Sequence, residues 1–236
     1  MILRSSLLTQ QQDITHGFTT KLGYPSDLSD PDATAAWIAV ADALGVPDGR
    51  VAVVRQVHGA DVLEVCGDDV PDARRCWLAG EADALVCASP GLLIAVRTAD
   101  CVPILVAGQG AVAAIHAGWR GLASGVIPAA MAALERLGAG PWRAAVGPCI
   151  GAAAYEVGQE VIDGISARVP TDVFVRPGPR RAHADLAAAA AWQLQQAGVA
   201  EVDVLGLCTF TDDRLHSFRR SRETAGRQAA VIGLLR

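Results

Sequence analysis

Apolar residues recur along this chain with two spacings, one typical of helices and the other of strands. Helical spacing predicts helices over 33–44, ending at Gly45, and over 122–137, ending at Gly138, with further helices near 155–168 and 183–197. Short apolar runs rich in Val and Ile, several bounded by Gly or Pro, predict strands over 51–57, 61–66, 83–88, 92–98, 102–107, 111–116, 143–147 and 202–208. A polar, Arg-rich tail follows the last of these strands.

The order of these elements indicates the fold class. Hairpin-like pairs of strands dominate the first half and helices are inserted later, so strict β-α-β alternation is missing. This order favours an α+β fold, a mixed-sheet α/β sandwich, over a doubly wound parallel sheet. The 236 residues contain no repeat or low-complexity linker and suffice for a continuous apolar core. We therefore expect a single domain over 1–236.

Composition and charge exclude several classes of protein. The net charge of -5 argues against a protein that coats nucleic acid, because phosphate binding needs a basic surface. Apolar runs fall short of the ~20 residues of a membrane-spanning helix, and the N-terminus does not resemble a secretory signal. Six cysteines without a C-x-x-C pair are typical of reduced thiols. We expect a cytoplasmic protein whose partners include neither nucleic acid nor membrane; its oligomeric state stays open.

Three side chains able to bind a metal lie where predicted strands give way to loops. His58 follows one apolar run, Cys101 follows another just before Pro103, and His116 closes a third. Two imidazoles and one thiolate make a three-ligand set for zinc, with a fourth position left for water or substrate. Only five histidines are present, which excludes sites built from many imidazoles. Three separately buried, hydrogen-bonded side chains are the alternative, which the spacing leaves open.

A second interpretation makes Cys101 a nucleophile activated by His58 or His116. Asp100 beside it weighs toward a metal-held thiolate, because a neighbouring carboxylate raises the pKa of a thiol unless a cation compensates. Cys149 is a rival thiol, which we interpret as a small packing residue.

Arginines supply the other chemical signal, since guanidinium groups suit phosphate or carboxylate ligands. Arg97, Arg120, Arg219 and Arg220 lie near motif-like segments, whereas Arg222 and Arg227 are expected in a solvated tail. The glycine-rich turn 147–151 offers backbone N–H groups to an anion.

Several segments together resemble the YfiH, or laccase-domain, family. The resemblance runs in order from about residue 16 to 227 and rests on Arg55-Gln56-Val57-His58-Gly59, Glu81-Ala82-Asp83-Ala84-Leu85-Val86, Thr98-Ala99-Asp100-Cys101-Val102-Pro103, His116-Ala117-Gly118-Trp119-Arg120-Gly121, Val146-Gly147-Pro148-Cys149-Ile150-Gly151, Tyr155-Glu156-Val157-Gly158 and Ser217-Phe218-Arg219-Arg220 with Gly226-Arg227. The chain departs from the family at 21–25, Lys-Leu-Gly-Tyr-Pro, where members often carry an Arg and a Gly-Gly-Val-Ser loop.

The resemblance implies a fold similar to the catalytic domain of cytotoxic necrotizing factor and a zinc ion held by His58, Cys101 and His116. It also implies a purine nucleoside phosphorylase that cleaves adenosine, inosine and methylthioadenosine with phosphate, with adenosine deaminase activity. Some members are linked instead to editing of peptidoglycan precursors, which would suit a Cys/His hydrolase. A polyphenol-oxidase label with copper is also used, but five His without a His-x-His pair disfavour a multicopper site.

Residue roles follow as hypotheses from this resemblance. Nucleoside and phosphate are the expected partners. The residues expected to bind them are Arg55, Arg120, Arg219 and Arg220. In the deaminase reaction the metal would lower the pKa of a water that attacks the purine ring. Asp83 or Asp100 would serve either as an acid or base, or by orienting a metal-bound His. A non-catalytic small-molecule binder is the remaining, less favoured class.

Overall fold

Strands made of consecutive apolar residues form the core, because the fold covers both of their faces. The computed structural model describes residues 1–22, 34–47, 49–69 and 75–235. In β7, Leu92–Thr98, the side chains of Leu92, Ile94 and Val96 face the other sheet, and Leu93 and Ala95 face the opposite side. Such runs therefore lack the apolar/polar alternation of a half-exposed strand.

The described strands form two six-stranded mixed sheets and one short pair. The first sheet has the order β1 (Ile2–Leu3), β2 (Ile14–Thr19), β14 (Gln228–Leu234), β7, β3 (Arg50–Arg55) and β5 (Cys76–Glu81). The second has the order β13 (Val199–Val204), β10 (Ala139–Val146), β8 (Val102–Gln109), β9 (Val112–Ala117), β6 (Ala84–Cys87) and β4 (Val62–Val65). The short pair joins β11 (Val175–Arg176) to β12 (His183–Ala184).

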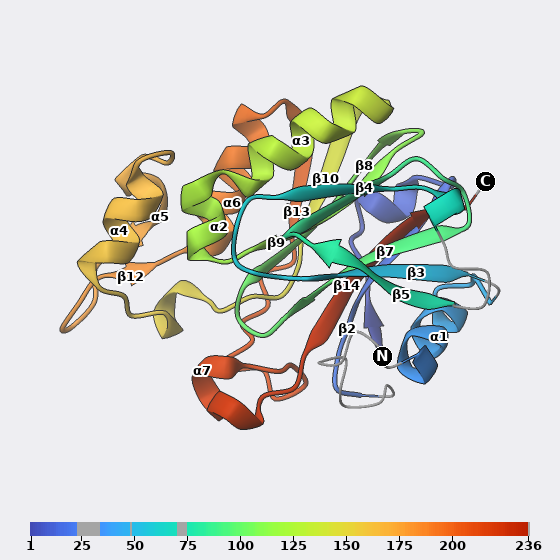
Figure 1. Ribbon diagram of the computed structural model, residues 1–236. Helices are drawn as coiled ribbons and strands as arrows, with labels where there is room; N and C mark the ends of the chain where they lie inside the picture. Colours follow the sequence, from blue (N-terminus) through green and yellow to red (C-terminus); the bar gives the residue numbers. More distant parts are fainter. Residues whose placement is uncertain (23–33, 48, 70–74, 236) are drawn as a thin grey trace.

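Helices cover the outer faces of the two sheets, as Figure 1 shows. The first sheet carries α1 (Thr34–Ala43), whose Trp37 and Val40 are fully buried against it. The second sheet carries α2 (Trp119–Ser124), α3 (Val126–Leu137) and α6 (Leu186–Gln196). Shorter helices are α4 (Gln159–Ser166), α5 (Thr171–Phe174) and α7 (Phe218–Ser221), with 3-10 turns at Leu8–Gln10, Gly67–Asp69, Ala152–Ala154 and Arg222–Thr224.

The α+β prediction is confirmed: two mixed sheets pack face to face and helices lie outside both. All eight strands predicted from apolar runs occur: the bounds predicted over 92–98 match those of β7, and the ends of the other seven are shifted. The likeness to the cytotoxic necrotizing factor domain and the single-domain organisation stay predictions. Within the described ranges, none of the helices combines the length and apolar character needed to cross a bilayer.

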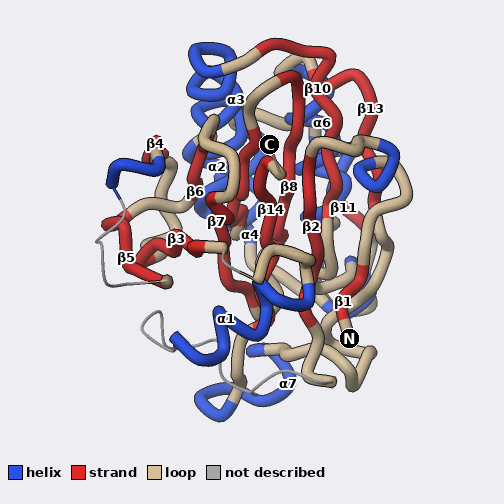
Figure 2. Tube along the Cα trace, turned by 90° about the vertical axis from the view of Figure 1, so that its right-hand side faces the viewer, coloured by secondary structure: helices blue, strands red, loops and turns tan. Residues whose placement is uncertain are grey.

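Three expectations were wrong. The Arg-rich tail contains β14, which runs between β2 and β7 (Figure 2). Of the expected hairpins, β8 with β9 is the main one that occurs. The strands β3, β4, β5 and β6 belong alternately to the first and the second sheet. They therefore pair in parallel, β3 with β5 and β4 with β6. The helix predicted over 122–137 is two helices, since Gly125 adopts a φ of 90° between α2 and α3. The departure from the family at Gly23-Tyr24-Pro25 lies outside the described residues.

Candidate active site

His58, Cys101 and His116 converge at one place, as the zinc hypothesis requires. One ligand atom from each lies within 4.8 Å of the others, and the two imidazole rings meet edge-on with centroids 4.9 Å apart. His58 follows β3 of the first sheet, whereas Cys101 precedes β8 and His116 lies near the end of β9 in the second. The group therefore forms where the ends of both sheets meet.

Asp83 holds two of these three residues in place. Its buried carboxylate accepts the backbone N–H groups of Val57 (3.2 Å), His58 (3.0 Å) and Gly59 (2.6 Å), and it lies 2.7 Å from Nδ1 of His116. His58 has a φ of 61°, an unusual backbone conformation for a non-glycine residue. The three N–H donors converging on one carboxylate explain how the chain maintains that conformation.

The contact with Asp83 also determines which nitrogen of His116 is available. Nδ1 faces the carboxylate, so Nε2 is left to face a metal or a reacting group. Burial would lower the pKa of His116, but the neighbouring Cys101 and Asp83 raise it above the usual value. Burial would likewise raise the pKa of Asp83, whereas the hydrogen bonds from His116 and Gly59 lower it.

The surroundings of Cys101 favour its thiolate form. Burial would raise the pKa of its thiol, but the adjacent His116 and His58 lower that pKa below the usual value. Cys149 behaves oppositely, because burial without a cationic partner raises its pKa. It lies among the core residues of the second sheet, consistent with the packing role inferred for it.

The three side chains fit a metal ion by their chemistry and their surroundings. Imidazole nitrogen and thiolate sulfur suit zinc, and a carboxylate–histidine contact is the usual support of a zinc-bound imidazole. Gly118 faces this group: a Cβ there would lie 2.9 Å from Sγ of Cys101 and 3.2 Å from Cδ2 of His58. Any larger residue at 118 would push the ligands aside. The group is able to hold a metal ion.

A cavity of about 610 Å³ opens over the three residues. Its volume is typical of small-molecule sites. Aromatic and apolar side chains line part of its wall, and arginines line much of the rest. The described residues that line it are Gln56, His58, Arg97, Thr98, Ala99, Asp100, Cys101, His116, Gly118, Trp119, Arg120, Ile150, Tyr155, Leu186, Phe218, Arg219, Arg222 and Arg227.

Two of the expected substrate arginines line this cavity. Arg120 lies with its guanidinium carbon 4.3 Å from the centre of a Trp119 ring, and Arg219 lies 5.1 Å from that of Tyr155. Arg97 also lines it. Arg222 and Arg227, expected in a solvated tail, line it as well, because β14 returns the C-terminal segment to the centre of the first sheet.

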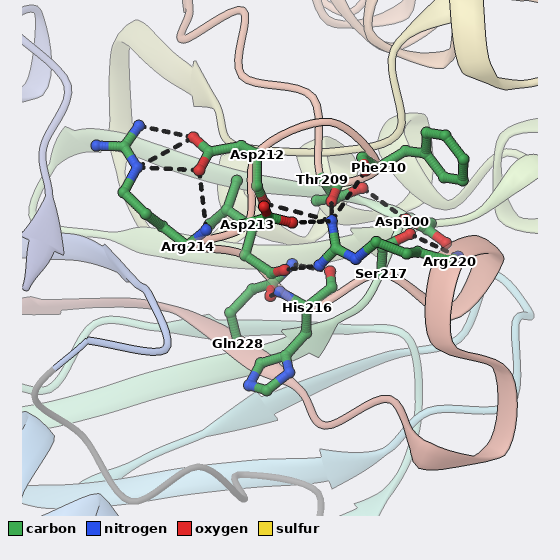
Figure 3. A network of polar contacts seen from close by, with 11 residues as sticks. Asp100, Thr209, Phe210, Asp212, Asp213, Arg214, His216, Ser217, Arg220 and Gln228 are labelled. Carbon is green, nitrogen blue, oxygen red and sulfur yellow. Dashed lines mark hydrogen bonds and ion pairs between the residues drawn. The ribbon is translucent and has the colours of Figure 1, made fainter.

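Arg55 and Arg220 do not line the cavity. Arg55 forms an exposed ion pair with Glu81, with 3.2 Å between nitrogen and oxygen. Arg220 extends into its own loop, where its guanidinium donates to the carbonyl oxygens of Thr209 (2.9 Å) and Phe210 (2.9 Å), as Figure 3 shows. It also donates to the carbonyl oxygen of Leu215. Arg219 and Arg220 are adjacent in the sequence, but Arg219 lines the cavity whereas Arg220 binds carbonyl groups of its own loop.

Asp100 connects the cysteine to that loop. Its carboxylate accepts the Thr209 hydroxyl (2.5 Å) and the backbone N–H of Arg219 (2.6 Å), and its φ is 89°. The two carboxylates therefore differ in their contacts: Asp83 contacts a proposed ligand, whereas Asp100 positions an arginine-bearing turn.

The expectation that turn 147–151 binds an anion was wrong. The N–H groups of turn 147–151 are already donated, to Pro103, Leu207, Asp100 and Cys208, so this turn offers none to an anion. His16 is buried in β2 and accepts the N–H of Ser5, away from the cavity. Gln56 and Phe218, which the sequence reasoning did not single out, lie inside the R-Q-V-H-G and S-F-R-R segments that could have indicated them.

Comparison with known proteins gives a consistent result. The family model described as multi-copper polyphenol oxidoreductase laccase matches residues 22–235. A purine nucleoside phosphorylase of Deinococcus radiodurans is 38% identical over 94% of this chain and 90% of its own length. One from Streptomyces coelicolor is 40% identical over 87% and 84%. The purine nucleoside phosphorylase YfiH of Escherichia coli is 35% identical over 77% and 73%.

Solved structures extend the match to the fold. A Neisseria meningitidis protein superposes with a TM-score of 0.80 at 32% identity, covering 95% of both chains. YlmD from Geobacillus stearothermophilus gives a TM-score of 0.81 at 30% identity, covering 95% of this chain and 93% of its own. The chain therefore belongs to the laccase-like, or YfiH, family.

Proposed function

We propose that this protein is a zinc-dependent purine nucleoside phosphorylase that cleaves adenosine, inosine and methylthioadenosine with orthophosphate and has a side activity as an adenosine deaminase. One observation carries the proposal: a His-Cys-His group opens onto a cavity of about 610 Å³ lined by arginines. The names of the curated relatives support the same reaction class.

Different residues of the cavity lining would bind the two substrates, orthophosphate and the nucleoside. Arg120 and Arg219 would bind orthophosphate, because guanidinium groups form paired, charge-assisted hydrogen bonds with its oxygens. Trp119, Tyr155 and Phe218 offer aromatic surface to the purine base. A phosphate oxygen would then form a bond to C1′ of the ribose while the bond from C1′ to the purine nitrogen breaks. The base leaves with the bonding electron pair and takes up a proton.

His58, Cys101 and His116 would hold the metal, and zinc suits their nitrogen and sulfur ligands better than magnesium or calcium. A bound zinc supplies a Lewis acid, which polarises oxygen groups and makes water a better nucleophile at neutral pH. Asp83 would keep the His116 ring oriented with Nε2 toward the site. Asp100 would hold the backbone of Arg219 so that its guanidinium stays at the cavity wall.

Elemental analysis paired with an inosine assay tests this proposal. We expect stoichiometric zinc in the purified protein, and hypoxanthine release that needs orthophosphate. Cys101→Ala should lose both. Cys149→Ala is the matched control, because this buried thiol lies outside the metal-binding group and should keep zinc and activity. Zinc-loaded protein without phosphorolysis would overturn the proposal, and copper in place of zinc would overturn its metal.

A second candidate is a metal-free hydrolase acting on peptidoglycan precursors. The lowered pKa of Cys101 beside two imidazoles favours it, because a thiolate next to His is the usual arrangement of a cysteine nucleophile. This enzyme would retain its activity after complete removal of metal and would be labelled at Cys101 by iodoacetamide with loss of activity. The phosphorylase would lose its activity with the metal.

A further inference from the structure

The cavity carries more positive charge than one orthophosphate ion would neutralise. Among the described residues, no carboxylate oxygen lies within 4.0 Å of the guanidinium groups of Arg120, Arg219, Arg222 or Arg227. Asp100 is the one acidic side chain in the described lining, and its oxygens already accept two hydrogen bonds. Orthophosphate carries about two charges, so positive charge is left for another anion even after the charge of Asp100 is subtracted.

The four arginines form two pairs, which we call the first and the second wall of the cavity. Arg120 and Arg219 lie against Trp119 and Tyr155. Arg222 and Arg227 come from the segment that enters β14, where Gln228 pairs with Thr98 of β7. A single phosphate group bound on the first wall would leave the second wall unoccupied.

Residues with a strained backbone line the cavity, and one of them, Arg222, belongs to the second wall. The described residues include three non-glycine residues with positive φ, and all three line this cavity: His58, Asp100 and Arg222, whose φ is 52°. Strained residues gather at ligand sites, because the surrounding structure must hold them there at a cost. Arg227 is also restrained, since its Nη1 donates to the carbonyls of Ala225 (2.7 Å) and Gly226 (3.0 Å).

We propose that Arg222 and Arg227 form a second anion site, which binds a phosphate group carried by the nucleoside itself. The preferred substrates would then be phosphorylated purine nucleosides, with orthophosphate on the first wall and the substrate's own phosphate on the second. This inference rests on the proposed function for its base and ribose, whereas the anion site rests on the arginines alone. The cavity volume of about 610 Å³ is in the usual range for small-molecule ligands.

Isothermal titration with inosine 5′-monophosphate and with inosine tests the site directly. For the zinc-loaded protein we expect the monophosphate to bind about tenfold more tightly or better, because two charge-assisted contacts are added. Arg222→Gln and Arg227→Gln should each remove most of this preference while changing inosine binding little. Arg136→Gln, an exposed arginine on α3, is the matched control and should leave both affinities unchanged.

Two further arms make the outcome decisive. Saturating orthophosphate should preserve the preference for the monophosphate; if it abolishes the preference, Arg222 and Arg227 are the orthophosphate site and the inference is wrong. Arg227→Lys keeps the charge and should recover part of the preference, which separates loss of charge from damage to the turn. Equal affinities for the two ligands, or variants that weaken both alike, would also overturn it.

Phosphorolysis is measured separately on inosine. A tight, arginine-dependent monophosphate site in a protein that does not cleave inosine would leave this inference standing and overturn the proposed function. Cleavage of inosine without any preference for the monophosphate would support the proposed function and overturn this inference.

Discussion

One carboxylate orients two of the three proposed metal ligands. Asp83 contacts Nδ1 of His116 and accepts the backbone N–H of His58, although it lies in a different sequence segment from either. Its side chain has no exposed surface, so its oxygens have no water to replace these donors. The geometry of the site therefore depends on a residue that does not line the cavity.

Asp83→Asn should weaken metal binding by about 10- to 100-fold, the usual cost of losing a partner behind a metal-bound imidazole. The amide has one acceptor oxygen where the carboxylate has two, so the four N–H donors around it cannot all be satisfied. Competition against a chromogenic zinc chelator measures the change. Asp163→Asn, an exposed position on α4, is the control; equal affinities of the two variants would contradict the role given to Asp83.

His16 makes the stability of the fold dependent on pH. Burial, with a smaller effect from Arg4, lowers its pKa from 6.5 to about 4. Between these values the unfolded chain binds a proton that the folded chain does not, so the free energy of unfolding falls as the pH drops. The full loss is about 3 kcal/mol, reached near pH 4. His16→Gln keeps an acceptor for Ser5 and should flatten this dependence in urea titrations; parallel curves for both proteins would rule the explanation out.

At the scale of elements, the junction between α2 and α3 determines how the helical layer meets the cavity. Gly125 ends one helix and begins the other in a left-handed conformation. Arg168 closes the end of α2, since its guanidinium donates to the carbonyls of Ala123 (2.8 Å) and Ser124 (3.2 Å). Because α2 carries Trp119 and Arg120, this junction positions one wall of the cavity.

Gly125→Ala should lower the stability by about 2 kcal/mol through backbone strain and displacement of Arg168. A Cβ at 125 would lie 2.8 Å from Cζ of Arg168. Gly45→Ala provides the comparison, because its φ is 81° but a Cβ there would meet nothing within 4 Å. Thermal unfolding should show the larger loss for Gly125→Ala. Equal losses would mean that the contact with Arg168 contributes nothing.

At the scale of the whole molecule, the two sheets pack through a layer to which distant segments contribute. Ile232 in β14 is fully buried there with Phe18 of β2 and Leu105 of β8. The C-terminal strand therefore contributes to the core of the molecule, and it also returns Arg222 and Arg227 to the cavity. Stability and the second cavity wall both depend on it.

Ile232→Ala should reduce the free energy of unfolding by about 2 to 5 kcal/mol, the usual cost of a cavity left by a large aliphatic side chain in a core. Leu235→Ala, one residue beyond the strand and 38% exposed, should cost much less. Urea denaturation of both variants measures the difference. A small loss for Ile232→Ala would mean that β14 is not part of the cooperative core.

The sequence by itself determined the apolar runs that became strands, the α+β class and the residues of the group that could hold a metal ion. These follow from local pattern, because a strand covered on both faces must be apolar throughout, and from motifs that keep His58, Cys101 and His116 in recognisable surroundings. The motifs also contained Arg120 and Arg219, which line the cavity.

Only the tertiary structure decided which strands pair and which arginines face the site. Parallel pairing of β3 with β5 and of β4 with β6 is invisible in local pattern, because it depends on crossovers between two sheets. Arg219 and Arg220 are neighbours in sequence, yet one lines the cavity and the other binds loop carbonyls. Burial is encoded in the chemistry of each residue, whereas the direction of a side chain depends on contacts with segments far away along the chain.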